Sequence, residues 1–244
     1  MDALPHLGPR LLALAEAVIP ARTAADIGCD HAQLAAYLVG RGICPRVIAT
    51  EVAPHLVTTA RNYVAGLGLA DRLELRCGSG LVPLAEGEAS TVVIGGMGGR
   101  TIAQILRDAG NKVKSYDRLV LQPMTDIGEL RRWLHENGFA CLDERAVTEG
   151  RHLYQAMVVE PRESANGLSL ELSRLLELLG WEIGPVLLWQ RPAEALTLIN
   201  QLEARRRELL EQTARAHSSR CLIQRRNRWQ RELAALKDLR EAID

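Results

Sequence analysis

Apolar and polar positions alternate in two distinct rhythms over residues 9–137. Apolar runs of strand length lie at 23–27, 46–50, 73–77, 91–94 and 118–121. Segments in which apolar residues recur at helical spacing lie at 9–18, 31–40, 54–66, 101–109 and 127–137. Strands that alternate with helices of this length predict a parallel sheet with crossover helices, a doubly wound α/β domain.

Two further strand-like runs follow, at 140–147 and 152–159, and Glu149-Gly150 between them predicts a tight turn. Five parallel strands followed by an antiparallel pair are typical of the methyltransferase variant of the Rossmann-like fold. The dinucleotide-dependent dehydrogenases use a different arrangement.

The composition shifts at residues 161–167, which predicts two domains, at 1–162 and 163–244. Beyond the shift we expect a helix at 168–179, a break at Gly184-Pro185 and two long helices. Apolar seams with steps of three, four and seven residues mark these long helices, through Leu196, Ile199, Leu202, Leu209 and Ala216, and through Leu222, Trp229, Leu233, Leu236 and Ile243. A turn at 217–219 would let the two seams bury each other in an antiparallel, coiled-coil hairpin.

Composition describes an ordinary water-soluble chain of 244 residues, with 47% hydrophobic and 25% charged residues. The five cysteines are scattered, with no Cys-x-x-Cys pair, which favours a reducing cytoplasm and no metal site. No apolar stretch is long enough to span a membrane, and the segment 11–19 contains Glu16, unlike a signal peptide. A monomer is the simplest expectation.

The net charge is zero, but its distribution is uneven. The segment 215–231 holds six arginines and no acidic residue: Arg215, Arg220, Arg225, Arg226, Arg228 and Arg231. Such a basic face suits contact with phosphates, and a solvated helix face is the competing interpretation.

The candidate chemistry begins where the first strand meets the first crossover helix, at Asp26-Ile-Gly28-Cys29-Asp30-His31. Glu51 ends the second strand, at the distance expected for a carboxylate that binds ribose hydroxyls. A pyrophosphate would need a glycine-lined helix start without a carboxylate. Because Asp30 occupies that start, the electrostatics favour S-adenosylmethionine, which carries no phosphate and is cationic near its methyl group.

Three further turns at the same sheet edge are candidates for ligand contact. Gly78-Ser79-Gly80 follows the third strand, Gly95-Gly-Met-Gly-Gly99 the fourth and Gln122-Pro-Met124 the fifth. Glycines clustered around one methionine make a poor strand or helix, so we expect a loop where backbone approaches cofactor and substrate. Tight packing is the alternative explanation.

These motifs, with Arg131-Arg-Trp-Leu134 and the strand containing Tyr154, resemble the bacterial tRNA adenine-N1 methyltransferases that act at tRNA position 22, the TrmK family. The resemblance covers almost the whole chain. It departs at Ser79, where the family tends to have aspartate, and at Met124, where it tends to have asparagine.

The resemblance implies S-adenosylmethionine as cofactor, tRNA as partner and N1 of adenine 22 as target. Asp30 is the candidate to accept a proton from the exocyclic amine, with His31 assisting or holding the turn. The expected cofactor contacts are Asp26, Gly28, Cys29, Glu51, Val52, Gly78, Ser79, Gly80, Gly95, Gly96 and Met97. The expected substrate contacts are Arg10, Gly98, Gly99, Gln122, Arg225, Arg226 and Arg228.

Three alternatives stay open at this point. A methyltransferase for a small molecule would not need a long basic helical arm, so deleting it would spare activity. A silent RNA-binding relative would keep its RNA affinity when Asp30 is replaced. An NAD-dependent enzyme is disfavoured because the expected phosphate-binding glycines are missing.

Overall fold

The computed structural model describes residues 4–162, 169–214 and 219–243. Contacts divide the chain into two compact units, Met1–Ala165 and Asn166–Asp244, which are considered separately below. The boundary expected at 162/163 and most of the turn expected at 217–219 lie outside the described residues.

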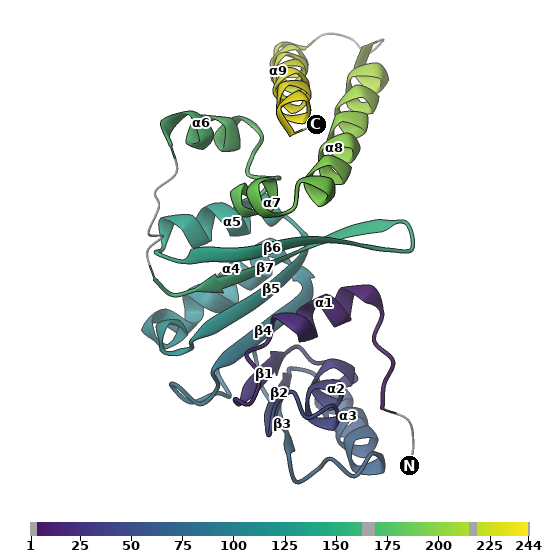
Figure 1. Cartoon of the computed structure of the whole chain (residues 1–244), viewed down its shortest axis with the longest axis vertical. Helices are drawn as coiled ribbons and strands as arrows, with labels where there is room; N and C mark the ends of the chain where they lie inside the picture. The colour runs from purple at the N-terminus through teal and green to yellow at the C-terminus, as the bar shows by residue number, and fades with distance from the viewer. Residues whose placement is uncertain (1–3, 163–168, 215–218, 244) are drawn as a thin grey trace. The chain divides into compact units, whose positions relative to one another are not determined.

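The first unit is built on one seven-stranded sheet with the order β3-β2-β1-β4-β5-β7-β6 (Figure 1). The strands β1 to β5 are parallel, and β7 pairs antiparallel with both β5 and β6. The strand bounds are Ala24–Ile27 (β1), Val47–Glu51 (β2), Leu73–Cys77 (β3), Thr91–Gly98 (β4), Arg118–Thr125 (β5), Ala140–Glu149 (β6) and His152–Glu160 (β7). The predicted class, five parallel strands followed by an antiparallel pair, is confirmed.

Helices cover both faces of this sheet, because the central strands are apolar on both sides. The buried apolar residues form two core clusters. Ala24 of β1 and Val93 of β4 belong to the first, and their neighbours Ala25 and Val92 belong to the second. The first cluster takes in α1 (Pro9–Ala17), α2 (Gln33–Gly40) and α3 (Pro54–Gly66). The second takes in α4 (Gly99–Ala109), the 3-10 helix η1 (Gly110–Ser115) and α5 (Ile127–Glu136).

Strands β4 and β5 extend well beyond the runs predicted from the sequence. The glycines after Ile94 were expected to form a loop, but β4 continues to Gly98 and β5 continues beside it to Thr125. The added pairing is irregular, with register shifts between Gly95, Met97 and Gly98. The expectation of a loop was wrong. Glycine has a low strand propensity, but the neighbouring strand supplies backbone hydrogen-bond partners that outweigh it.

The second unit is helical, with bounds at Leu170–Leu178 (α6), Pro185–Gln190 (α7), Pro192–Ala214 (α8) and Arg220–Ile243 (α9). Glu203 of α8 pairs with Arg240, and Arg206, further along α8, pairs with Glu232, which comes earlier in α9. The order reverses, so the two helices run antiparallel, as expected; their coiled-coil packing stays a prediction. The short helix α7 begins at Pro185, where only a break was expected.

Across the described ranges, no helix is both long enough and apolar enough to cross a membrane. Over those same residues, no three His, Cys, Asp or Glu side chains come together as a metal ion would require.

Candidate cofactor and active site

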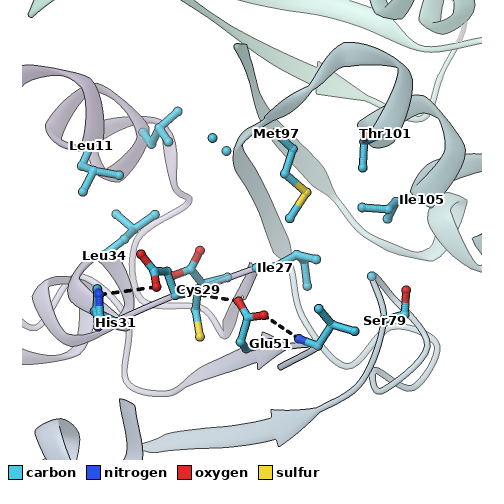
Figure 2. Close-up of a pocket in the computed structure, with 18 of the residues that line it drawn as sticks. Leu11, Ile27, Cys29, His31, Leu34, Glu51, Ser79, Met97, Thr101 and Ile105 are labelled. Carbon is cyan, nitrogen blue, oxygen red and sulfur yellow. Dashed lines mark hydrogen bonds and ion pairs between the residues drawn. The ribbon is translucent and has the colours of Figure 1, made fainter. Parts of the chain in front are cut away.

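A cavity of about 710 Å³ opens where β1, β2 and β4 end (Figure 2). In a doubly wound sheet the strand order reverses between β1 and β4, and ligands bind in the crevice at that point. The eleven residues expected to contact a cofactor all line this cavity, as do Asp30, His31 and Arg10. The sequence motifs therefore converge on one site.

The turn between β1 and α2 has an unusual backbone. Gly28, Asp30 and Ala32 have φ angles of 71°, 50° and 55°, the left-handed region. The amides of Gly28 and Cys29 both donate to the carbonyl oxygen of Thr50, at 2.8 and 3.0 Å. Left-handed non-glycine residues cost of order 1–3 kcal/mol each and persist where neighbours hold them, often at functional sites.

Glu51 fastens this turn to the end of β2 (Figure 2). Its side chain is buried, with Oε2 accepting from the Asp30 amide at 3.3 Å. Its Oε1 accepts from the amides of Val52 and Ala53, at 2.8 and 3.1 Å. A carboxylate oxygen has more than one lone pair, so Glu51 keeps acceptor capacity for a ligand hydroxyl.

Burial raises the pKa of Asp26 to about 7, and the nearby Glu51 carboxylate adds to this, although a hydrogen bond from the Ala35 backbone opposes it. Burial and the carboxylate of Asp26 also raise the pKa of the Cys29 thiol, which stays neutral. With Asp30 and Asp108, the cavity holds four carboxylic acids against Arg10 and His31. This environment fits a cationic ligand and opposes a pyrophosphate, so the residues present fit S-adenosylmethionine.

Met97 and Gly28 line the cavity and lie directly against each other. A Cβ atom on Gly28 would overlap the Cε atom of Met97, and the φ angle of 71° independently disfavours a side chain there. Gly99 is buried, and a Cβ atom there would overlap the backbone oxygen of Asp126. The glycines thus permit close approach of β4 to the first turn and of α4 to α5.

Asp30 and His31 stand at the mouth of the cavity, with exposed fractions of 63% and 56% for their side chains. The Nε2 atom of His31 lies 3.5 Å from Oδ1 of Asp30 (Figure 2). An exposed carboxylate at the mouth is available to a substrate, whereas the buried Asp26 and Glu51 carboxylates face the interior of the site.

Gln122 joins the wall of the cavity to α1. Its Oε1 accepts from Nη1 of Arg10 at 2.9 Å and from the Gly96 amide at 3.2 Å. Its Nε2 donates to the Pro123 carbonyl oxygen at 3.0 Å and lies 3.5 Å from the Met124 sulfur. Gln122 is 1% exposed, so its amide stabilises the wall from behind. Arg10 also lies over the Tyr154 ring, 5.6 Å from the centroid.

The other expected substrate residues divide between two places. Gly98 and Gly99 join β4 to α4 and do not line the cavity, while Arg225, Arg226 and Arg228 belong to the second unit. The sequence reasoning missed one face of α4, whose residues Thr101, Gln104, Ile105 and Asp108 line the cavity. Their spacing of three, four and seven residues was a readable helical signal.

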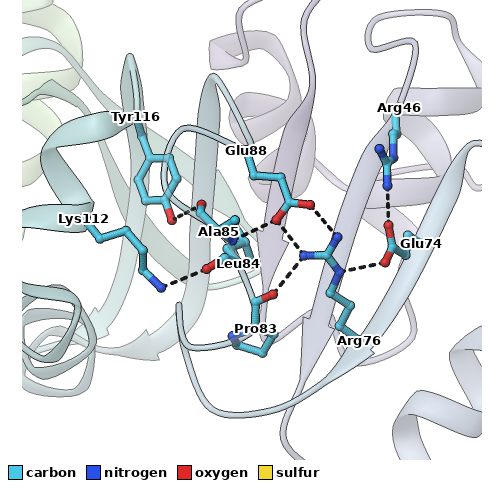
Figure 3. A network of polar contacts seen from close by, with 9 residues as sticks. All are labelled: Arg46, Glu74, Arg76, Pro83, Leu84, Ala85, Glu88, Lys112 and Tyr116. Carbon is cyan, nitrogen blue, oxygen red and sulfur yellow. Dashed lines mark hydrogen bonds and ion pairs between the residues drawn. The ribbon is translucent and has the colours of Figure 1, made fainter.

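The loop after β3 is anchored by Arg76 (Figure 3). Its guanidinium makes a bidentate ion pair with Glu88, at 2.7 and 2.6 Å, and donates to the Pro83 carbonyl oxygen at 2.8 Å. The hydrogen bond from Arg76 lowers the pKa of Glu88 to about 2. Lys112 of η1 donates to the carbonyl oxygens of Leu81 and Leu84. These contacts fix the loop that carries Gly78, Ser79 and Gly80 into the cavity.

Comparisons with known proteins agree with this fold. Residues 7–157 match the family model described as a methyltransferase domain. The class is therefore that of the Rossmann-like methyltransferases. The tRNA (adenine(22)-N(1))-methyltransferase of Bacillus subtilis is 32% identical over 213 residues, 86% of this chain and 87% of that protein. The chain belongs to the tRNA (adenine(22)-N(1))-methyltransferase family, the TrmK family.

Solved structures extend the likeness to the whole chain. The crystal structure of the B. subtilis m1A22 tRNA methyltransferase TrmK is 29% identical, with a TM-score of 0.83, covering 98% of this chain and 100% of that one. A putative tRNA (m1A22) methyltransferase of Streptococcus pneumoniae, solved with S-adenosyl-L-methionine, is 28% identical. Its TM-score is 0.76, covering 96% of this chain and 100% of that one.

Proposed function

We propose that this protein transfers a methyl group from S-adenosylmethionine to ring nitrogen N1 of the adenine at position 22 of tRNA. The observation that carries the proposal is an acidic cavity with the exposed Asp30 carboxylate at its mouth. The reaction named for the B. subtilis relative supports the same substrate and target. The methyltransferase domain corresponds to residues 1–162 and the helical domain to 163–244.

The cofactor is held by residues of the first unit. Glu51 accepts hydrogen bonds from the ribose hydroxyls, and Val52, which is 64% exposed, packs against the adenosine. The backbone of Gly78-Ser79-Gly80 would hold the adenine of the cofactor, while Gly28, Cys29, Gly95, Gly96 and Met97 shape the remaining wall. Asp26 stabilises the positive charge of the ligand by its own ionisation. When bound, the cofactor supplies an electrophilic methyl group on a sulfonium.

Asp30 acts on the target base. N1 of neutral adenine has a free lone pair, so no base is needed to create the nucleophile. As N1 gains its methyl group the adenine becomes cationic, and the carboxylate of Asp30 accepts a hydrogen bond and then the proton from the exocyclic amine. His31, 3.5 Å away, orients the carboxylate.

The substrate must present an unpaired base, because N1 lies on the base-pairing edge. Arg10 borders the cavity and interacts with the entering nucleotide, while Gln122, Gly98 and Gly99 keep the wall in shape. Arg225, Arg226 and Arg228 of the second unit provide phosphate contacts, which make binding sensitive to salt.

The test is incubation of purified protein with unmodified tRNA and methyl-labelled S-adenosylmethionine, followed by mapping of the labelled nucleotide. Label on N1 of adenine 22 is the expected result. Label at another position would contradict the target but keep the reaction. Absence of label with demonstrated cofactor binding would favour a small-molecule substrate or a silent RNA binder.

We expect Glu51→Ala to weaken S-adenosylmethionine binding by about 1–3 kcal/mol, because it removes acceptors for the ribose hydroxyls. Isothermal titration calorimetry measures the change. Glu51→Gln is the matched variant, since it keeps one acceptor oxygen for the Val52 and Ala53 amides. Affinity unchanged in both variants would remove Glu51 from the cofactor site.

We expect Arg76→Gln to lower the free energy of unfolding by about 1–3 kcal/mol and to weaken cofactor binding, because the loop after β3 loses its anchor. Arg46→Gln is the control: Arg46 is half exposed and forms a surface ion pair with Glu74, so the expected loss is under about 0.5 kcal/mol. The measurements are denaturant unfolding and calorimetric titration. Equal losses in both variants would contradict an anchoring role for Arg76.

The same ion pair has a defined pH dependence. The pKa of Glu88 is lowered, so its contribution to stability is complete above the ordinary pKa of 4.5 and is lost as pH falls towards 2. Arg76→Gln should therefore differ less from the wild type at low pH than at neutral pH.

A further inference from the structure

The second unit contains a hollow of about 320 Å³ between α8 and α9. Its walls are formed by Glu182, Arg205, Arg206, Leu209, Arg225, Arg228, Trp229 and Glu232. Four guanidinium groups face two carboxylates, which leaves a surplus of two positive charges. The residues from α9 recur at steps of three, four and seven, so they share one face of that helix.

Two of the arginines form a fixed frame. Arg206 is 7% exposed, donating from Nη2 to Glu182 at 2.9 Å and from Nε to Glu232. Glu232 is 2% exposed and also accepts from Nε of Arg228, at 2.6 Å. The buried ion pair of Arg206 and Glu232 holds both side chains in one arrangement, and the exposed Arg228 is tied to the same carboxylate, which preorganises this wall of the hollow.

The other two arginines, Arg205 and Arg225, come from α8 and α9 and are both exposed. Within residues 169–214 and 219–243, neither has a carboxylate partner. Two like charges on one hollow repel each other, and an anion placed between them relieves that repulsion. The planar guanidinium fork matches the oxygens of a phosphate group.

We propose that this hollow binds one backbone phosphate of the tRNA through Arg205 and Arg225, on the frame formed by Arg206, Glu232 and Arg228. The inference rests on the proposed function, because tRNA is taken as the source of the phosphate. The inference assigns different roles to the basic residues of α9. Arg225 lines the hollow, whereas Arg220 and Arg231 are exposed outside it.

The test compares two double variants of the full chain with the same change in charge. For Arg205→Gln with Arg225→Gln, we expect affinity for unmodified tRNA to fall about tenfold and the salt dependence to lose about one phosphate contact. For Arg220→Gln with Arg231→Gln, we expect a clearly smaller loss and a salt dependence close to that of the wild type. Equal losses in the two pairs would overturn the proposal in favour of diffuse attraction.

Two further measurements complete the design. Arg205→Lys with Arg225→Lys keeps both charges and should recover part of the affinity, with melting temperatures confirming that every variant is folded. Titration with inorganic phosphate addresses the source of the ligand. Phosphate binding to the hollow, combined with wild-type tRNA affinity in the glutamine pair, would overturn the assignment to RNA.

The outcomes also separate this inference from the proposed function. A wild-type protein that binds tRNA without methylating adenine 22 would contradict the proposed function and leave the phosphate site testable. A wild-type protein that methylates adenine 22, with both glutamine pairs alike in affinity, would contradict only the phosphate site.

Discussion

Asp30→Asn is expected to lower the turnover number for tRNA methylation by about 10²–10⁴-fold, the usual contribution of one positioned proton acceptor. Asparagine cannot take the proton from the exocyclic amine, and it offers no negative charge to the developing adenine cation. The substitution is well matched because Asn, like Asp, tolerates the left-handed backbone that residue 30 adopts, with φ of 50°. The contact from Asp30 to Glu51 uses the backbone amide and is preserved.

Single-turnover kinetics and cofactor titration measure the two consequences separately. The cofactor affinity of Asp30→Asn should stay within a few-fold of the wild type while turnover collapses. Asp108→Asn is the control, because Asp108 also lines the cavity and loses the same charge, but it lies on α4 and accepts from Gln104. Parallel losses of turnover and affinity in Asp30→Asn would make Asp30 a binding residue.

Cofactor affinity is expected to fall about tenfold for each pH unit below 7, because Asp26 must be ionised to stabilise a cationic ligand. Burial raises the pKa of Asp26 from 3.8 to about 7, so this carboxyl is largely protonated at pH 5 and largely ionised at pH 8. Binding at low pH must therefore release a proton. Calorimetry between about pH 5 and 8, in buffers of different ionisation enthalpy, counts that proton.

In the ligand-free protein, the contribution of Asp26 to folding stability should change with pH in the opposite direction. A carboxyl whose pKa is raised in the folded state stabilises the fold below its unfolded pKa of 3.8, and that contribution is lost as pH rises through about 7. The Asp26→Asn variant should bind S-adenosylmethionine weakly at every pH, and its affinity should no longer depend on pH. His31→Gln is the control and should keep the pH dependence, because it changes a neighbouring side chain of the cavity and leaves Asp26 in place. A flat affinity profile in the wild type would contradict the role of Asp26.

Local sequence signals predicted the elements well where one interaction dominates. Helix α3 begins at Pro54 and ends at Gly66 as the pattern indicates, because proline suits a first helical turn and the apolar spacing is regular. The turn after β1 and the acidic end of β2 were also readable, since Gly28 and Glu51 must lie at adjacent strand ends of a parallel sheet.

The glycine segment shows where local reasoning fails. Gly95 to Gly98 have poor strand propensity, yet they extend β4 because β5 lies alongside and supplies partners. Gln122 shows a related limit: its substrate contact stays a prediction, while its hydrogen bonds with Arg10, Gly96 and Pro123 could not be read from the sequence. Neither outcome is visible until strands distant in sequence are paired.

The sequence by itself determined the class of fold, the family and the residues that converge on the cavity, because each depends on a motif contained in one strand end or one helix. Tertiary structure decided the rest. The pKa of Asp26 depends on burial by several elements, and the face of α4 enters the site only through its packing. Which arginines of the second unit share a hollow depends on how α8 and α9 meet. Burial and electrostatics are set by groups far apart in the chain, so folding alone brings them together.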